Sequence, residues 1–159
     1  MRVRAYLSLG SNLGNRAEHL TRAVTELLKS GSLAAQSAFY ETEPVQLLAQ
    51  PWFLNCAVAL DTLLAPGELL VACLAIERAM GRLRSQAKGA RVIDIDIALY
   101  GDFVVETPDL VIPHPAMHER RFVLTPLAEI APDAMHPLLH KTVRALLAEL
   151  PAGQVVRKL

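Results

Sequence analysis

A single run of alternating residues restricts the fold of this chain more than any other feature. The run extends from Val92 to Tyr100 and contains two aspartates among aliphatic residues. Successive side chains of a strand point to opposite faces, so one face is apolar while Asp94 and Asp96 lie on the other. The expected apolar set is Ile93, Ile95, Ile97 and Leu99. Such a strand belongs in a sheet with one face packed against a core and one face available to polar groups.

The segments before this run also divide into strands and helices. Alternation of apolar residues predicts strands over residues 3–9, 33–40 and 53–63. Apolar residues at helical spacing predict a helix around Leu20–Leu28 that ends at Gly31. A second helix is expected from Pro66 to Gly81, with proline in its first turn. The predicted order is therefore β-α-β-β-α-β.

This order is that of the split β-α-β, or ferredoxin-like, fold, so we expect an α+β protein. Its sheet would be largely antiparallel with both helices on one face, which leaves the other face for a site. The remainder adds a proline-rich turn at Pro113–Pro115, a short helical stretch and a C-terminal helix over residues 141–150. We find no repeat, low-complexity tract or linker, so one domain is expected over residues 1–159.

The composition excludes several classes of protein. Apolar residues make up 52% and charged residues 20% of the chain, which is a globular balance. The 16 acidic and 16 basic residues cancel, so no overall field attracts nucleic acid or anionic lipid. The chain has neither a signal-peptide pattern nor the roughly 20 apolar residues of a membrane span, so we expect a cytoplasmic monomer without membrane or nucleic-acid partners. Cys56 and Cys73 lie in apolar runs, where we expect buried, reduced thiols.

Asp94 and Asp96 form a candidate metal site. Strand geometry places their backbones about 7 Å apart, from which two carboxylates can converge on one magnesium ion or straddle two. The segment before them contains no acidic residue and carries Arg82, Arg84, Lys88 and Arg91. A basic loop beside a metal-binding pair suits a polyphosphate, because magnesium binds some oxygens and guanidinium groups bind others. Gly81 and Gly89 would let this segment move as a lid. Taken alone, the aspartate pair could also be two solvated side chains on an exposed sheet face, and the basic segment could be a solvated loop.

Three further motifs leave alternatives open. Phe53 and Asn55 share a strand face and could bind a flat heterocycle, or they could be a packed ring and a turn-capping amide. The segment Gly10–Arg16 lacks the ending of a P-loop, so it is either a tight strand-to-helix connection or a functional loop. His114 and His118 have a spacing that zinc ligands can have, but no HExxH pattern and no obvious third ligand accompany them.

These segments together resemble the 6-hydroxymethyl-7,8-dihydropterin pyrophosphokinase (HPPK) family of folate biosynthesis. The resemblance covers nearly the whole chain in a consistent order, and the arginine followed by Asp-x-Asp is its most specific part. The matching segments are Ser8–Gly14, Tyr40–Pro44, Gln50–Asn55, Gly89–Ile97 and Ile112–Pro115.

The resemblance implies an enzyme that uses ATP and two Mg²⁺ ions. It would transfer the pyrophosphoryl group of ATP to the hydroxymethyl group of 6-hydroxymethyl-7,8-dihydropterin and release AMP. Asp94 and Asp96 would bind the metals and would be catalytic together with Arg82 and Arg91. The implied ATP-binding residues are Glu77, Arg82, Arg84, Arg91, Ile97, His114 and Arg120. The implied pterin-binding residues are Thr42, Pro44, Val45, Phe53, Asn55, Asp94 and Phe122, with the two phenylalanines on either side of the ring.

Several positions depart from the family pattern. Ala87 stands where a basic residue is usual, with Lys88 beside it, and the basic segment contains no tryptophan. Leu74 and Asp109 stand where polar or basic residues that contact the nucleotide can occur. These departures concern loop closure and ATP affinity rather than the chemistry.

The expected chemistry is in-line attack of the pterin hydroxyl on the β-phosphorus of ATP. A loose transition state needs positioning and charge neutralisation more than a general base, and Arg82 and Arg91 would stabilise the charge that moves toward the α-phosphate. A glycosyltransferase could also use Asp-x-Asp, but it generally needs a larger nucleotide-binding domain. An RNA-binding module of the same fold fits poorly with the neutral charge. A binding protein without catalysis would have less reason to retain both aspartates.

Overall fold

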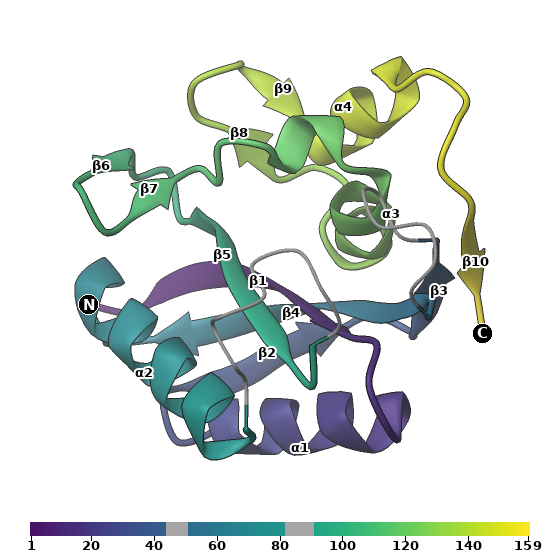
Figure 1. Ribbon diagram of the computed structural model, residues 1–159. Coiled ribbons are helices and arrows are strands. Elements are labelled where there is room, and N and C mark those ends of the chain that lie inside the picture. The colour runs from purple at the N-terminus through teal and green to yellow at the C-terminus, as the bar shows by residue number, and fades with distance from the viewer. Residues whose placement is uncertain (44–50, 82–90) are drawn as a thin grey trace.

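The computed structural model describes residues 1–43, 51–81 and 91–159 (Figure 1). In its centre a six-stranded sheet lies between two groups of helices. The first elements are β1 (Val3–Ser11), α1 (Arg16–Leu27), β2 (Ser32–Gln36), β3 (Tyr40–Thr42), β4 (Phe53–Thr62), α2 (Pro66–Ala79) and β5 (Asp94–Tyr100). They are followed by β6 (Val105–Glu106), β7 (Val111–Ile112), η1 (Met117–Glu119), α3 (Arg121–Ile130), β8 (Met135–His136), β9 (Lys141–Thr142), α4 (Val143–Glu149) and β10 (Val156–Lys158).

The strands of the central sheet pair in antiparallel fashion throughout the described residues. Their order is β10-β3-β4-β1-β5, and β2 also pairs with β4. β1 is central, with β4 along one edge and β5 along the other. The predicted α+β class and antiparallel sheet are thereby confirmed.

The strand predicted over residues 33–40 is in fact two strands. β2 and β3 both pair with β4, and the residues from Ser37 to Phe39 separate them. The Ser37 hydroxyl accepts a hydrogen bond from the Ala57 N–H at 2.9 Å, and the Ser37 N–H donates to the Ala57 carbonyl at 2.9 Å. A serine side chain that bonds the neighbouring backbone can replace a rung of the ladder, which alternation of apolar residues does not predict.

α1 and α2 cover one face of the sheet (Figure 1). α1 begins at Asn15, whose side chain accepts a hydrogen bond from the Glu18 N–H at 3.2 Å. α2 begins at Pro66, and the chain turns after it at Gly81, whose φ is +91°. Both predicted helices are confirmed on this face, and Cys56 and Cys73 are buried, unpaired thiols. The core between helices and sheet includes Leu7, Leu9, Leu20, Leu27, Leu54, Val58, Leu69, Ile76, Ile93, Ile95 and Ile97.

The opposite face is not free over its whole area, which corrects the expectation from sequence. α3 and α4 cover part of it and form a second core with the strands (Figure 1). This second core includes Ala57, Ala98, Leu99, Met117, Val123, Leu124, Leu127, Val143 and Leu146. The polar end of the face, around Asp94, stays half-exposed.

The predicted orientation of Leu99 is wrong. Leu7 of β1 lies opposite Ile97, but the adjacent Tyr6 lies opposite Leu99, so Ala98 is an extra residue in β5. A β-bulge of this kind reverses the alternation beyond it. Leu99 therefore joins the second core, whereas Tyr100 joins the first.

Candidate functional site

A row of three residues crosses the polar end of the sheet. Asn55 of β4 and Asp94 of β5 both lie opposite Gly10 of β1, which stands between them. Side chains of directly paired residues share a face, so the amide and the carboxylate flank a position that has no side chain. A Cβ at Gly10 would lie 2.6 Å from the Asn55 Nδ2 atom, so the Asn55 amide can lie this close to β1 only because the residue is glycine. Asp96 lies two residues further along β5 on the same face, opposite Ser8.

Asn55 is held in one orientation by buried partners. Its Oδ1 accepts a hydrogen bond of 2.6 Å from the Thr42 hydroxyl, and its Nδ2 donates to the Leu9 carbonyl at 3.3 Å. Both Asn55 and Thr42 are buried. A side-chain amide has two N–H donors and two acceptor lone pairs, so this network leaves one donor and one acceptor for a ligand. Phe53, two residues earlier on the same face, is half-buried beside Gly10.

The acidic side chains concentrate negative charge at this end of β5. Burial, followed by the negative charges of Asp94 and Glu77, raises the pKa of Asp96 to about 7. Arg120 and Arg91 lower the same pKa and so offset part of the effect. Glu77, which is buried in α2, accepts a hydrogen bond from the Ile95 N–H at 2.7 Å and so joins the helix to β5.

The aspartates suit a divalent cation that takes few protein ligands. Asp94 and Asp96 are both half-exposed on one face, where an ion would relieve their mutual repulsion. The described residues contain no group of three or more His, Cys, Asp or Glu placed to hold a metal. Magnesium commonly binds one or two carboxylates and completes its shell with water and phosphate oxygens. The donor set therefore fits magnesium better than zinc.

Two cationic groups and a neutral histidine border the acidic pair. Arg91 Nη1 lies 3.0 Å from Asp94 Oδ2, and Arg91 Nε is buried without a hydrogen-bond partner among the described residues. Burial and then the charge of Arg120 lower the pKa of His114, so its ring is neutral at pH 7. The Nδ1 atom of His114 accepts from the Ala116 N–H at 3.1 Å, which leaves the proton on Nε2. His114 can thus donate a hydrogen bond to an anion without carrying charge.

Asn12 joins the segments on either side of the site. Its N–H donates to the Arg91 carbonyl at 3.0 Å, and its Oδ1 accepts from the Arg91 N–H at 2.6 Å. Its Nδ2 also donates to the Pro51 carbonyl at 3.1 Å. Gly10 and Asn12 belong to the segment for which the sequence left open a tight connection or a functional loop, without a specific role for either residue, although a glycine inside a strand and an asparagine in the following turn are both signals of a close backbone approach.

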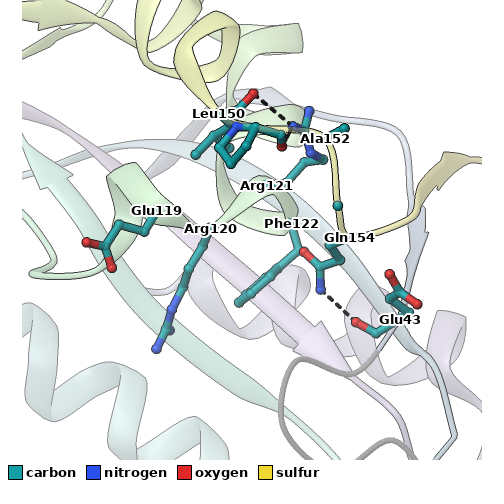
Figure 2. A pocket seen from close by; sticks show the side chains of 10 residues that line it. Glu43, Glu119, Arg120, Arg121, Phe122, Leu150, Ala152 and Gln154 are labelled. Carbon is teal, nitrogen blue, oxygen red and sulfur yellow. Dashed lines mark hydrogen bonds between the residues drawn. The ribbon is translucent and has the colours of Figure 1, made fainter.

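Phe122 and Arg120 approach the site from the start of α3. The Arg120 Cζ atom lies 5.6 Å from the centroid of the Phe122 ring. Figure 2 shows both side chains extending in the same direction, on the wall of a pocket of about 370 Å³. The far wall of this pocket is the segment of residues 150–154, and Glu43 contributes to it as well.

The remaining predicted residues have different positions. Ile97 is buried in the first core, so its side chain points away from the aspartates. Its backbone groups face the outer edge of β5, as those of Ile95 do, because residues two apart in a strand share an orientation. His118 lies beside His136 with ring centroids 6.2 Å apart. Arg82, Arg84, Ala87, Lys88, Gly89, Pro44 and Val45 lie outside the described residues.

A family model decides the relationship of this chain to known proteins. The model of 7,8-dihydro-6-hydroxymethylpterin-pyrophosphokinase (HPPK) matches residues 6–132. The chain belongs to the HPPK family. A 2-amino-4-hydroxy-6-hydroxymethyldihydropteridine pyrophosphokinase of Methylorubrum extorquens is 50% identical over 154 residues, which are 95% of this chain and 96% of that protein. The enzyme of the same name from Bacillus subtilis is 45% identical over 128 residues, or 79% and 77% of the two chains.

Longer proteins contain an HPPK-like part as well. Folic acid synthesis protein fol1 of Schizosaccharomyces pombe is 43% identical, and the match covers 93% of this chain but 20% of that protein. A crystal structure of Plasmodium falciparum HPPK-DHPS with pteroate has a TM-score of 0.76 and 18% identity. It covers 94% of this chain and 42% of that one, so it supports the fold alone.

Proposed function

We infer that this HPPK-family chain transfers the pyrophosphoryl group of ATP to the hydroxymethyl group of 6-hydroxymethyl-7,8-dihydropterin in folate biosynthesis. Membership of the family and 50% identity to a pyrophosphokinase over nearly the full length of both chains support this function. The observation that carries it is the row formed by Asn55, Gly10 and Asp94, which puts an oriented amide on the same face of the sheet as the acidic pair, with only a glycine between the amide and Asp94.

The pterin would bind beside the Asn55 amide. The free donor and acceptor of Asn55 would pair with the ring edge, while Thr42 fixes the amide. Phe53 and Phe122 would stack on the two faces of the ring, because aromatic faces bind flat heterocycles. Pro44 and Val45, which lie outside the described residues, complete the proposed pterin-binding set.

ATP binds along the outer edge of β5. His114 and Arg120 would contact its phosphates, with Arg82 and Arg84 from the segment outside the described residues. Ile97 would contact ATP through its backbone. Glu77 would act through its hydrogen bond to the Ile95 N–H, which fixes β5. Asp94 and Asp96 would hold two magnesium ions. When bound, magnesium neutralises phosphate charge and polarises the phosphoryl oxygens.

The reaction joins the pterin hydroxyl oxygen to the β-phosphorus of ATP. As this bond forms, the bond from the β-phosphorus to the oxygen shared with the α-phosphate breaks, and AMP leaves with that oxygen. The hydroxyl proton passes to solvent. Arg91, which is bonded to Asn12 and Asp94, would stabilise the negative charge that moves onto the leaving oxygen, and Arg82 would assist it.

We propose further that the fold is ferredoxin-like and that residues 1–159 are a single domain. The antiparallel order of β2 and β3, β4, β1 and β5, with α1 and α2 on one face, supports this topology. We also propose a cytoplasmic monomer that binds ATP and the pterin but no nucleic acid. No helix of the described residues has the length and apolar character needed to cross a bilayer.

Product analysis tests the proposed function. The protein is incubated with ATP, magnesium and 6-hydroxymethyl-7,8-dihydropterin, and we expect AMP and the pterin diphosphate in equal amounts. ADP in place of AMP would contradict pyrophosphoryl transfer, and pterin binding without AMP would favour a binding protein. Asp94→Asn and Asp96→Asn should each lower turnover by about 10²-fold or more, whereas Asp133→Asn, which removes an exposed carboxylate paired with Arg144, should not.

A further inference from the structure

β10 lies along the outer edge of β3. Val156 pairs with Thr42, Arg157 with Glu41 and Lys158 with Tyr40, in antiparallel register. β3 is only three residues long, and without β10 it would be the edge strand of the sheet. A short strand with one partner is weakly held. β10 therefore fixes the strand that carries Thr42, the hydroxyl that orients Asn55.

The lead-in to β10 also holds the residue that follows Thr42. Glu43 donates its N–H to the Val155 carbonyl at 3.2 Å and accepts, through Oε1, from the Val155 N–H at 2.7 Å. The Gln154 Nε2 atom donates to the Glu43 carbonyl at 2.6 Å (Figure 2). Three hydrogen bonds thus hold Glu43, the residue that follows β3.

Arg157 of β10 reaches the residue that precedes Phe53. Its guanidinium lies 5.0 Å from the centroid of the Trp52 ring and donates to Glu41 Oε1 at 2.9 Å. Arg16 closes the network, because it donates to Glu41 Oε2 at 2.9 Å and to the Trp52 carbonyl at 3.0 Å. One arginine of β10 therefore ties the start of β4 to β3.

The same segment faces Phe122. Residues 150–154 form one wall of the pocket, and Phe122 and Arg120 form another (Figure 2). Arg121 holds the beginning of this wall, since its Nη2 donates to the Pro151 carbonyl at 2.8 Å. Residues 150–158 consequently lie against three of the four elements that carry described pterin-binding side chains: β3, the start of β4 and the start of α3, but not β5 with Asp94.

We propose that residues 150–158 are a positioning element of the pterin site, with Gln154 and Arg157 as its positioning residues. The proposal rests on the function proposed above. Neither side chain would touch the substrate. Each acts through a neighbour: Gln154 through Glu43 on Thr42, and Arg157 through Trp52 on Phe53. The element sets the affinity for the pterin and leaves the nucleotide side of the sheet, at β5, unaffected.

Separate binding measurements for the two substrates test the proposal. Gln154→Ala, Arg157→Ala and the double variant are titrated calorimetrically with 6-hydroxymethylpterin in the presence of magnesium and a non-hydrolysable ATP analogue. The double variant should bind the pterin about tenfold or more weakly, because small displacements of site residues have large effects. Its affinity for the ATP analogue alone should stay within about twofold of the original. Arg157→Lys should recover part of the loss, since it keeps the charge beside Glu41 but not the planar group over Trp52.

The outcomes separate this proposal from the proposed function. Arg144→Ala is the matched control, because it removes an exposed arginine of α4 that pairs with Asp133. This variant should bind both ligands normally. If the unaltered protein does not bind the pterin, the proposed function fails. If it binds and the folded double variant binds equally well, the positioning role fails. An equal loss of both ligands would also overturn the role, and the single variants decide the question if the double variant unfolds.

Discussion

At the scale of single residues, the site depends on one missing side chain and one fixed amide. Gly10 lets the Asn55 amide lie close to β1, on the same face as Asp94. Asn55 donates one hydrogen bond to the Leu9 carbonyl and accepts one from the Thr42 hydroxyl. Its second N–H and its second oxygen lone pair therefore have a defined direction. An amide without these partners could rotate and would present either group to the ligand.

Substitution of Gly10 by alanine should weaken binding of the pterin. The added Cβ would lie 2.6 Å from Asn55 Nδ2, so the amide must move out of its network. We expect the KM for the pterin to rise about tenfold or more while the KM for ATP changes little. Gly67→Ala in α2 is the control, because nothing lies within 4 Å of its Cβ. It should stabilise the helix by about 0.5–1 kcal/mol and leave both KM values unchanged; unchanged KM values in Gly10→Ala would contradict the role proposed for the Asn55 amide.

The pKa of Asp96 predicts a pH dependence of stability in the metal-free protein. Its folded pKa is about 7 against an ordinary value of 3.8, because of burial and the charges of Asp94 and Glu77. Between these values the folded state binds more protons than the unfolded state, so stability falls as pH rises from about 4 to about 7. Asp96→Asn removes this loss, and at pH 8 in EDTA it should be more stable than the original by roughly 1–3 kcal/mol.

Urea denaturation of both proteins across this pH range measures the difference. We expect the two unfolding free energies to converge as the pH falls toward 4 and to separate toward pH 8. Parallel curves would mean that Asp96 is not under strain from its acidic neighbours. The variant that is more stable without metal should be the less active one, as is common where a site concentrates like charges.

At the scale of elements, α3 links the second core to the site. Its inner face buries Val123, Leu124 and Leu127 against the sheet, and Arg120 and Phe122 stand at its first turn. At its other end Glu129 accepts hydrogen bonds from the Tyr40 hydroxyl at 2.5 Å and from the Ala38 N–H. The packing of α3 therefore determines where the Arg120 guanidinium and the Phe122 ring lie relative to β3.

Leu124→Ala should test how strongly the second core holds α3. Leu124 is fully buried, so removal of its side-chain atoms should lower the unfolding free energy by about 2–5 kcal/mol. Leu138→Ala, at a position that is 57% exposed, should change it by less than about 0.5 kcal/mol. Chemical denaturation monitored by circular dichroism measures both. A small effect at Leu124 would show that α3 does not depend on this core.

At the scale of the whole molecule, one sheet separates two cores, and only one of them lies on the face that carries the proposed site. The side chains of the core under α1 and α2 take no part in the proposed site. This side of the sheet contributes to the site only through the backbone of Ile97 and the buried carboxylate of Glu77. The other face holds the second core, the acidic pair and the row through Gly10. Ligands that bridge β5, β4 and α3 would thus tie together parts of the chain that are distant in sequence.

Magnesium and nucleotide should consequently stabilise the entire fold. At a ligand concentration 100 times the dissociation constant, a ligand that binds only the folded state adds about 2.7 kcal/mol to the unfolding free energy. We expect a non-hydrolysable ATP analogue with magnesium to raise Tm, and EDTA to remove most of this increase. Asp96→Asn should show a much smaller response to magnesium. A response equal to that of the original protein would place the metal elsewhere.

The sequence by itself determined the periodic parts of this protein. Alternation and helical spacing correctly predicted β1, β4, β5, α1 and α2, because each packs a regularly spaced set of apolar side chains into the core between the sheet and these two helices. The Asp-x-Asp pair was visible for the same reason, since strand alternation alone puts Asp94 and Asp96 on one face. The motifs around it were sufficient to indicate the HPPK family that the comparisons then established.

Only the tertiary structure decided what depends on contacts between distant segments. The bulge at Ala98 turns Leu99 to the second core, and it arises from pairing with β1 rather than from local residues. β10 pairs with a strand more than 100 residues earlier in the chain, and Asn12 bonds to Arg91, which is 79 residues later in the chain. No short-range pattern encodes such partners, because the hydrogen bonds that define them form only when the sheet and α3 have brought the segments together.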